Sequence, residues 1–360
     1  LNTSSEMVNQ LNSNIMWGQR SNFVSVPTDC PQRDERLGWA ADTQVFSMAG
    51  LYNADTRNFY AKWMRDMRDS QRSDGAYPHV APYSWGVGYG AGAWADAGII
   101  LPWNVYLMTG DKKLIEDNWT SMEKYMTWLT SQAGEGYTYN GGTTTYGDWL
   151  SFDNTDSRYC SVCYYALDAQ LMAKMAQALS TSDNDKYARK AKNYNTRFEN
   201  IRNEWQARYL NTSGTLNINT QTAYLMALHY NLLTDDNAID KTRTALKNNI
   251  RNNGNKLTTG FLGTAILNQT LSEQGLNDEA YTLLLQRDCP SWLYSIDQGA
   301  TTVWERWNSY TVKDGFGDPG MNSFNHYAYG AVAEWMFRHM AGIGPDENNV
   351  GFRHIRLAPN

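Results

Sequence analysis

Residues 26–42, with the sequence VPTDCPQRDERLGWAAD, combine four carboxylates, two arginines and one tryptophan. Pro27 and Pro31 disfavour helix in the first part of this stretch. The run from Arg36 to about Gly50 predicts a helix. Several acidic groups are therefore expected in a loop and on the first turn of that helix, where like charges raise one another's pKa. A carboxylic acid with a raised pKa is what general acid catalysis at neutral pH requires.

The same charges also have a purely structural explanation. Asp34 and Glu35 near a helix start would interact favourably with the helix dipole. Arg33 and Arg36 could pair with them on the surface. The rest of the chain is needed to decide between a catalytic and a structural role.

Outward from this stretch, apolar spacing predicts about a dozen helices and almost no strand. The expected helices are 5–19, 36–50, 54–70, 94–108, 112–131, 161–180, 184–207, 220–233, 236–253, 261–274, 277–286 and 324–341. Charged helices alternate with helices that are apolar on all sides, and the latter are expected to be buried. Six such outer–inner hairpins predict an all-α fold, an (α/α)6 barrel. An α-solenoid is the alternative, but no repeat of fixed period is present.

The connections indicate which end of the barrel carries the function. The expected loops from outer to inner helices are long, namely 21–35, 71–93, 132–160 and 287–323. Most connections from inner back to outer helices are short. The long loops are thus expected at one end of the barrel, and long loops without secondary structure usually serve a function.

Length and charge limit the class of protein. A chain of 360 residues fits one large barrel over 1–350, and its net charge of −6 argues against a nucleic-acid or anionic-membrane partner. No apolar run reaches the length of about 18 residues that a membrane span requires. The chain begins with Leu1 and shows no signal peptide, so we expect a piece of a longer protein. Residues 351–360 alternate weakly and predict a strand that leads into a β-domain; a periplasmic or secreted location is favoured over the cytoplasm.

The cysteines carry little information. Cys160 and Cys163 resemble half of a metal or redox motif, but no second pair and no nearby histidine pair accompanies them. Ordinary thiols are the favoured interpretation. We therefore expect neither a metal nor a cofactor.

The second acidic site is Thr301–Trp307, where Glu305 lies between Trp304 and Trp307 and beside Arg306. A glycosidase needs two carboxylates that flank the bond to be cut. Tryptophan walls stack on sugar rings and lower the local dielectric, which raises the pKa of an acid. A surface salt bridge between packed aromatic residues is the structural alternative.

Five motifs, which follow one another along most of the chain, make the sequence resemble the α-L-rhamnosidases of glycoside hydrolase family 78. They are DCPQRDERLGW at 29–39 followed by Asp42, YGDWL at 146–150, TTGFLGT at 258–264, DQGATTVWERW at 297–307 and NHYAYG at 325–330. The resemblance implies an (α/α)6 catalytic domain and inversion at the anomeric carbon. It also implies that Glu35 is the general acid and Glu305 the general base.

The remaining site residues are also implied by the resemblance. Its motifs assign binding of the sugar to Asp29, Arg33, Trp39, Asp42, Asp148, Trp149, Trp304 and His326, and Trp94 and Asp96, outside the motifs, are added to this set. Without the resemblance, His326 alone would be interpreted as a core histidine. Inversion leaves room for a water molecule, so the two catalytic carboxyl groups are expected about 6.5–9.5 Å apart.

The sequence departs from the family pattern in three respects. Ala40 and Ala41 stand where Thr-Gly is common before Asp42, and Asn308 stands where an Asp is common. The β-sandwich domains that usually flank the barrel are absent from the sequence. The expected substrate is a rhamnose-containing glycoside or polysaccharide. The alternatives are another (α/α)6 sugar enzyme, an inactive carbohydrate-binding fragment, or a helical scaffold for protein partners.

Overall fold

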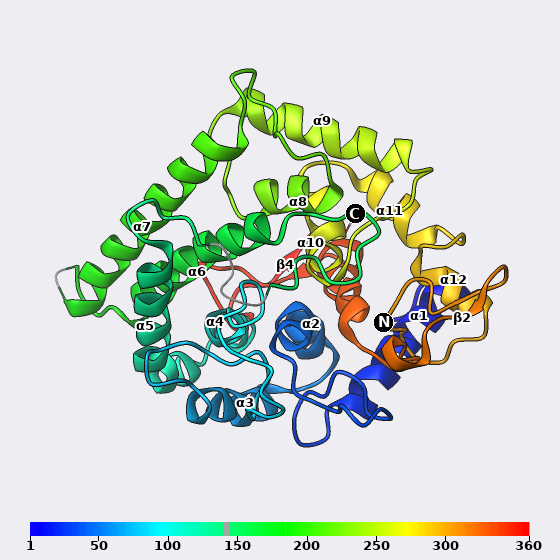
Figure 1. Ribbon diagram of the computed structural model, residues 1–360, viewed down its shortest axis with the longest axis horizontal. Coiled ribbons are helices and arrows are strands. Elements are labelled where there is room, and N and C mark those ends of the chain that lie inside the picture. The colour runs from blue at the N-terminus through cyan, green and yellow to red at the C-terminus, as the bar shows by residue number, and fades with distance from the viewer. Residues whose placement is uncertain (140–144, 184, 360) are drawn as a thin grey trace.

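The computed structural model describes residues 1–139, 145–183 and 185–359. Its helices form a ring of hairpins, with one set of helices inside and the other outside (Figure 1). The outer helices are α1 (Glu6–Asn22), α3 (Arg57–Asp69), α5 (Lys113–Ala133), α7 (Lys186–Tyr209), α9 (Asp236–Asn252) and α11 (Asn277–Leu285). The inner segments are α2 (Ala40–Asn53), α4 (Ala97–Thr109), α6 (Ser157–Leu179), α8 (Gln221–His229), α10 (Phe261–Glu273) and the run 328–340. The predicted (α/α)6 barrel is thus confirmed.

Hydrophobic patterning explains which helices lie inside. In α4 every residue from Ala97 to Met108 except Asn104 is buried, whereas α3 buries one side only, through Tyr60, Trp63, Met64 and Met67. A helix that is apolar all round can remove its whole apolar surface from water only in the interior of the barrel. The ring closes because the run 328–340 packs against both α2 and α10.

The last inner segment is not the continuous helix 324–341 that apolar spacing predicts. It consists of the 3-10 turn Ala328–Ala331, the short helix α13 (Val332–Trp335) and the π turn Met336–Met340. Residues 324–327 instead belong to the preceding loop, where the backbone N–H of His326 donates to the carbonyl of Val303. The prediction was therefore wrong about the regularity of this segment and right about its place in the ring.

Two further elements were missed by the sequence analysis. Helix α12 (Trp292–Asp297) and the hairpin of β1 (Tyr310–Thr311) and β2 (Gly315–Phe316) lie inside the expected loop 287–323. A second antiparallel pair joins β3 (Ile343–Gly344) to β4 (Arg356–Leu357), so part of the segment 351–360 returns to the barrel. Residues 140–144 of the expected loop 132–160, residue 184 at an expected helix start, and residue 360 lie outside the described residues.

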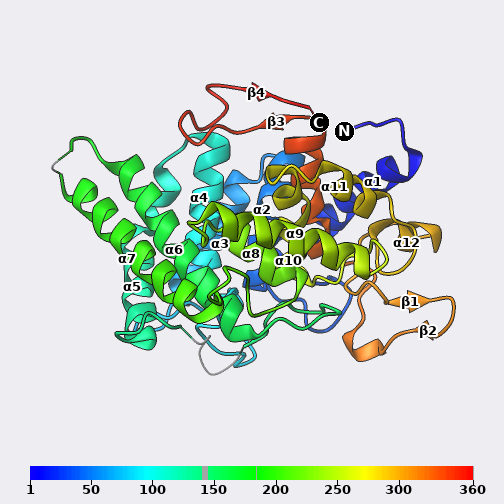
Figure 2. The ribbon, with the colours of Figure 1, turned by 90° about the horizontal axis from the view of Figure 1, so that it is seen from above.

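The two ends of the barrel differ. Figure 2 shows the β3–β4 hairpin and both termini at one end, and the β1–β2 hairpin with the long loops at the other. This arrangement places the loop before α2 and the loop that carries Glu305 at the same end, since Nη1 of Arg33 and Oε2 of Glu305 lie 2.9 Å apart. Among the described residues, no helix combines the length and apolar character needed to span a bilayer.

Candidate active site

The segment before α2 is extended and folded back on itself. The Asp29 carboxylate accepts the backbone N–H of Leu37 at 2.9 Å, and the Asp29 N–H donates to the Leu37 carbonyl at 2.9 Å. Helix α2 begins at Ala40 rather than at Arg36 as predicted. The reason is that the Ala40 N–H pairs with the carbonyl of His79, outside the helix, while Arg36 adopts a left-handed backbone with φ of 45°. The result is a tight loop that presents the residues between Asp29 and Leu37.

Arg33 connects the two candidate catalytic carboxylates. Its Nη2 lies 2.6 Å from Oε2 of Glu35, and its Nη1 lies 2.9 Å from Oε2 of Glu305. The same Nη2 also lies 3.5 Å from Asp29. The structure therefore brings Glu35, Glu305 and Asp29 together around one guanidinium, although Glu305 comes from a loop 270 positions further along the chain.

Glu305 is an almost fully buried carboxylate that is held in its ionised form. Burial alone would raise its pKa, but nearby His326 and Arg33 and the backbone N–H of Ser323 lower the pKa below the usual value. A buried carboxylate with a depressed pKa is ready to accept a proton. Glu305 thus has the protonation state that a general base needs at neutral pH.

His326 supplies part of that positive charge. Its Nε2 lies 3.1 Å from Oδ1 of Asp42, on the first turn of α2. Burial would lower the pKa of His326, but the hydrogen bond and charge of Asp42, together with Glu305, raise the pKa above its usual value. The motif near the C-terminal end and the motif before α2 therefore meet in one charged network.

The carboxyl group whose pKa is raised most clearly in this network is Asp29. Burial raises its pKa to about 6; His326 opposes this shift, and Asp42 and Glu35 add to it. The expectation that crowded carboxylates raise one another's pKa thus applies to Asp29. Glu35 itself accepts a hydrogen bond from the indole N–H of Trp39 at 2.7 Å, which fixes the orientation of its carboxyl group.

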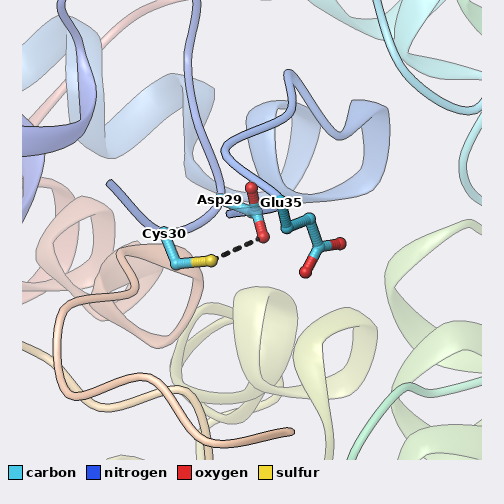
Figure 3. A group of neighbouring side chains, drawn as sticks. All are labelled: Asp29, Cys30 and Glu35. Carbon is cyan, nitrogen blue, oxygen red and sulfur yellow. Dashed lines mark hydrogen bonds between the residues drawn. The ribbon is translucent and has the colours of Figure 1, made fainter. Parts of the chain in front are cut away.

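Asp29, Cys30 and Glu35 form the one group of side chains, within the described part of the chain, whose spacing could hold a metal ion (Figure 3). The Cys30 thiol donates to Oδ2 of Asp29 at 2.9 Å. Burial and the neighbouring Asp29 raise the pKa of the Cys30 thiol. The guanidinium of Arg33 lies 3.5 Å from Asp29 and 2.6 Å from Glu35, so a positive charge already stands beside both carboxylates.

Aromatic side chains enclose these charges in a cavity of about 240 Å³. Tyr146 forms part of the cavity wall beside three tryptophans. The distances between ring centres are 4.5 Å to Trp94, 5.8 Å to Trp39 and 6.0 Å to Trp149. Paired aromatic faces beside carboxylates are typical of a sugar-binding site, since the rings pack on C–H groups and the charges bond hydroxyls. The volume suits one sugar unit rather than a larger ligand.

Most of the side chains assigned to the site by the sequence line this cavity. Those that do are Asp29, Arg33, Glu35, Trp39, Asp42, Trp94, Trp149, Glu305 and His326. Asp96, Asp148 and Trp304 are not among its lining residues. Each of these three side chains is buried outside that lining.

Asp148 lies beneath the cavity at the start of α10. Its carboxylate accepts the backbone N–H groups of Gly260, Leu262 and Gly263 at 2.8–3.1 Å, and the hydroxyl of Thr222. A carboxylate at a helix N-terminus satisfies N–H groups that have no partner within the helix. Asp148 therefore fixes the loop that carries Trp149 to the helix that begins with Phe261.

Asp96 and Trp304 pack against residues that do not line the cavity. Asp96 accepts the hydroxyl of Tyr125 at 3.1 Å and lies in a buried pair with Asp168; burial raises the pKa of both carboxyl groups. Trp304 packs edge-on against Phe324, 5.1 Å between ring centres, and lines a separate small hollow. Spacing along the sequence could not distinguish a side chain that faces the cavity from one that supports it.

Three lining residues were absent from the predicted set, namely Tyr146, Phe261 and Met321. Tyr146 and Phe261 belong to the quoted motifs YGDWL and TTGFLGT, so membership in a motif was the available signal. Met321 lies in the turn Pro319–Met321 within the loop 287–323, and nothing in its sequence surroundings marks it.

A helical barrel whose long loops bring two carboxylates into an aromatic-walled cavity has the architecture of a glycosidase domain. The family of this domain follows from comparison with known proteins. Residues 1–340 match the model of the bacterial alpha-L-rhamnosidase 6 hairpin glycosidase domain, and the chain belongs to that family.

Relatives with high identity carry the same name. An alpha-L-rhamnosidase of Streptomyces avermitilis is 42% identical over 99% of this chain, and one of Formosa agariphila is 38% identical over 99%. The chain spans 33% and 38%, respectively, of the length of these two relatives.

Solved structures agree with this assignment. The S. avermitilis alpha-L-rhamnosidase complexed with L-rhamnose superposes with a TM-score of 0.93 at 41% identity, covering 100% of this chain and 34% of that one. The native rhamnosidase of Aspergillus terreus gives 0.92 at 32% identity, covering 100% and 42%.

Proposed function

We propose that this domain hydrolyses terminal, non-reducing α-L-rhamnose from glycosides or polysaccharides, with Glu35 as general acid and Glu305 as general base. The observation that carries the proposal is the meeting of these two carboxylates at Arg33, inside a cavity the size of one sugar. The family assignment and the rhamnose complex of the Streptomyces relative support L-rhamnose as the sugar.

In the proposed reaction, protonated Glu35 gives its proton to the glycosidic oxygen as the bond from this oxygen to the anomeric carbon breaks. Ionised Glu305 takes a proton from a water molecule, whose oxygen forms the new bond to the anomeric carbon. The leaving alcohol carries away the proton of Glu35, and exchange with solvent restores both groups. The depressed pKa of Glu305 keeps it available as the base.

The stereochemical outcome is part of the proposal. Nη2 of Arg33 lies 2.6 Å from Oε2 of Glu35 and 3.4 Å from Oε1 of Glu305, so these two oxygens are at most about 6 Å apart. This limit concerns one oxygen of each group; the two carboxyl carbons, each a bond of about 1.2 Å away, lie at most about 8.4 Å apart. That limit overlaps the range of about 6.5–9.5 Å expected between the carboxyl groups of an inverting enzyme. We propose inversion, with the attacking water beside Glu305.

The test is hydrolysis of p-nitrophenyl α-L-rhamnopyranoside followed by proton NMR from the first turnover. Inversion gives β-L-rhamnose as the first product, and mutarotation then forms the α anomer slowly. Initial formation of the α anomer would refute the acid–base assignment. Turnover of a different p-nitrophenyl sugar, with none of the rhamnoside, would refute the substrate.

A further inference from the structure

Tyr146 lines two separate cavities. Besides the sugar cavity, it lines a groove of about 790 Å³ between the N-terminal end of α6 and the C-terminal end of α7. The other side chains that line this groove include Asn154, Asn217, Arg208 and Tyr209. The groove therefore begins at the wall of the sugar cavity and leads away from it across the same end of the barrel.

A second groove of about 570 Å³ continues in the same direction. It lies between the segment before α8 and the C-terminal end of α9, and its side chains include Asn219, Tyr224, Asn248 and Asn252. The two grooves adjoin, because consecutive residues at 153–154 and at 218–219 line one groove and then the other.

The chemistry of both grooves is that of a saccharide site. Asparagines make up most of the lining of the second groove, and two more line the first groove beside Ser157, Asp156 and Arg208. Each carboxamide carries two donors beside an acceptor, a pattern that matches neighbouring hydroxyls of a sugar. Tyr209 and Tyr224 add aromatic rings with a polar edge. The charged residues of the lining, Asp153, Asp156 and Arg208, carry both signs. Such a polar surface without an excess of positive charge favours a neutral polyol over a phosphate or an apolar ligand.

We propose that the two grooves form a track, Tyr146 to Asn252, that binds the oligosaccharide to which the terminal rhamnose is attached. The inference rests on the proposed function, because a cavity for one terminal sugar leaves the remainder of the substrate outside it. The track lies where that remainder leaves the cavity at Tyr146. The preferred substrates are accordingly rhamnose-terminated oligosaccharides or polysaccharides rather than small aryl rhamnosides.

The test compares two substrates that share the terminal sugar: a tetrasaccharide ending in α-L-rhamnose and p-nitrophenyl α-L-rhamnopyranoside. The variant combines Asn154→Ala, Asn248→Ala and Asn252→Ala, three exposed positions along the track. We expect kcat/KM for the tetrasaccharide to fall about tenfold or more, since each lost hydrogen bond weakens binding severalfold. The value for the aryl glycoside should stay within about twofold. The control is Asn237→Ala, an exposed asparagine at the opposite end of α9.

Equal losses on both substrates, or no loss on either, would overturn the track. Failure of the track is distinguished from failure of the proposed function by calorimetry, which measures binding of the trisaccharide that lacks the rhamnose. Trisaccharide binding that the triple variant abolishes, in a protein that releases no rhamnose, would retain the track and refute the hydrolase. Release of rhamnose without trisaccharide binding would retain the hydrolase and refute the track.

Discussion

Substitution of Asp148 by alanine is expected to destabilise the barrel strongly although this residue does not line the cavity. The change removes the acceptor for three backbone N–H groups at the start of α10 and for the Thr222 hydroxyl. Each buried N–H left without a partner costs about 1–3 kcal/mol, so the expected loss from the three groups is about 3–9 kcal/mol of unfolding free energy. A loss of this size is a large fraction of the total stability of about 5–15 kcal/mol that is usual for a folded protein.

The assay is urea unfolding followed by far-UV circular dichroism, with the parent and the variant measured side by side. The matched control is Asp153→Ala, five positions further along the same loop, where the carboxyl group is only partly buried. We expect the control to change the unfolding free energy by less than about 1 kcal/mol. A second readout is the KM for the aryl rhamnoside, which should rise because the loop that carries Trp149 loses its anchor. If Asp148→Ala costs no more than the control, the reasoning about the helix start is refuted.

Three further predictions concern the cavity. Glu35→Gln and Glu305→Gln should each lower kcat on p-nitrophenyl α-L-rhamnopyranoside by at least about a hundredfold; near-parental turnover by either variant would remove that residue from the mechanism. Because burial raises the folded-state pKa of Asp29 from 3.8 to about 6, its unfavourable contribution to stability should appear as pH rises from about 4 to 6. Urea unfolding at pH 4 and pH 7 should therefore show a smaller decline for Asp29→Asn than for the parent, and an equal decline would contradict the shift. Dialysis against EDTA should leave kcat/KM unchanged, and a loss restored by a divalent cation would reveal a metal site.

The barrel could be predicted from the sequence because hydrophobic patterning determines which helices are buried. Helix α4 is apolar on every side and α3 on one side only, and this contrast alone assigns them to the inner and outer rings. The exact start of α2 could not be predicted, because it depends on a hydrogen bond between Ala40 and the distant His79. The short elements of the loop 287–323 likewise depend on packing at the end of the barrel rather than on local periodicity.

The site was predictable at the level of motifs and less so at the level of side-chain direction. Glu35 and Trp39 come from the first motif and meet in the cavity. Asp148 and Trp149 are neighbours in one motif, yet only Trp149 lines the cavity while the carboxylate of Asp148 points to the start of α10. Adjacent residues in a loop can face opposite directions, and no periodic rule applies to them as it does to a strand. A motif therefore identifies the region of a site, while the contacts of each side chain identify its role.

The closure of the ring has a consequence for synthesis of the protein in the cell. The first inner helix, α2, has the run 328–340 as one of its neighbours, so its contacts join residues almost 300 positions apart. During translation, the earlier hairpins emerge with the apolar sides of α2 and α10 still uncovered. The circle is completed only when residues near Trp335 leave the ribosome. Apolar surface exposed in this way promotes aggregation, so a truncation before the last inner segment is expected to yield an aggregating fragment rather than a smaller barrel.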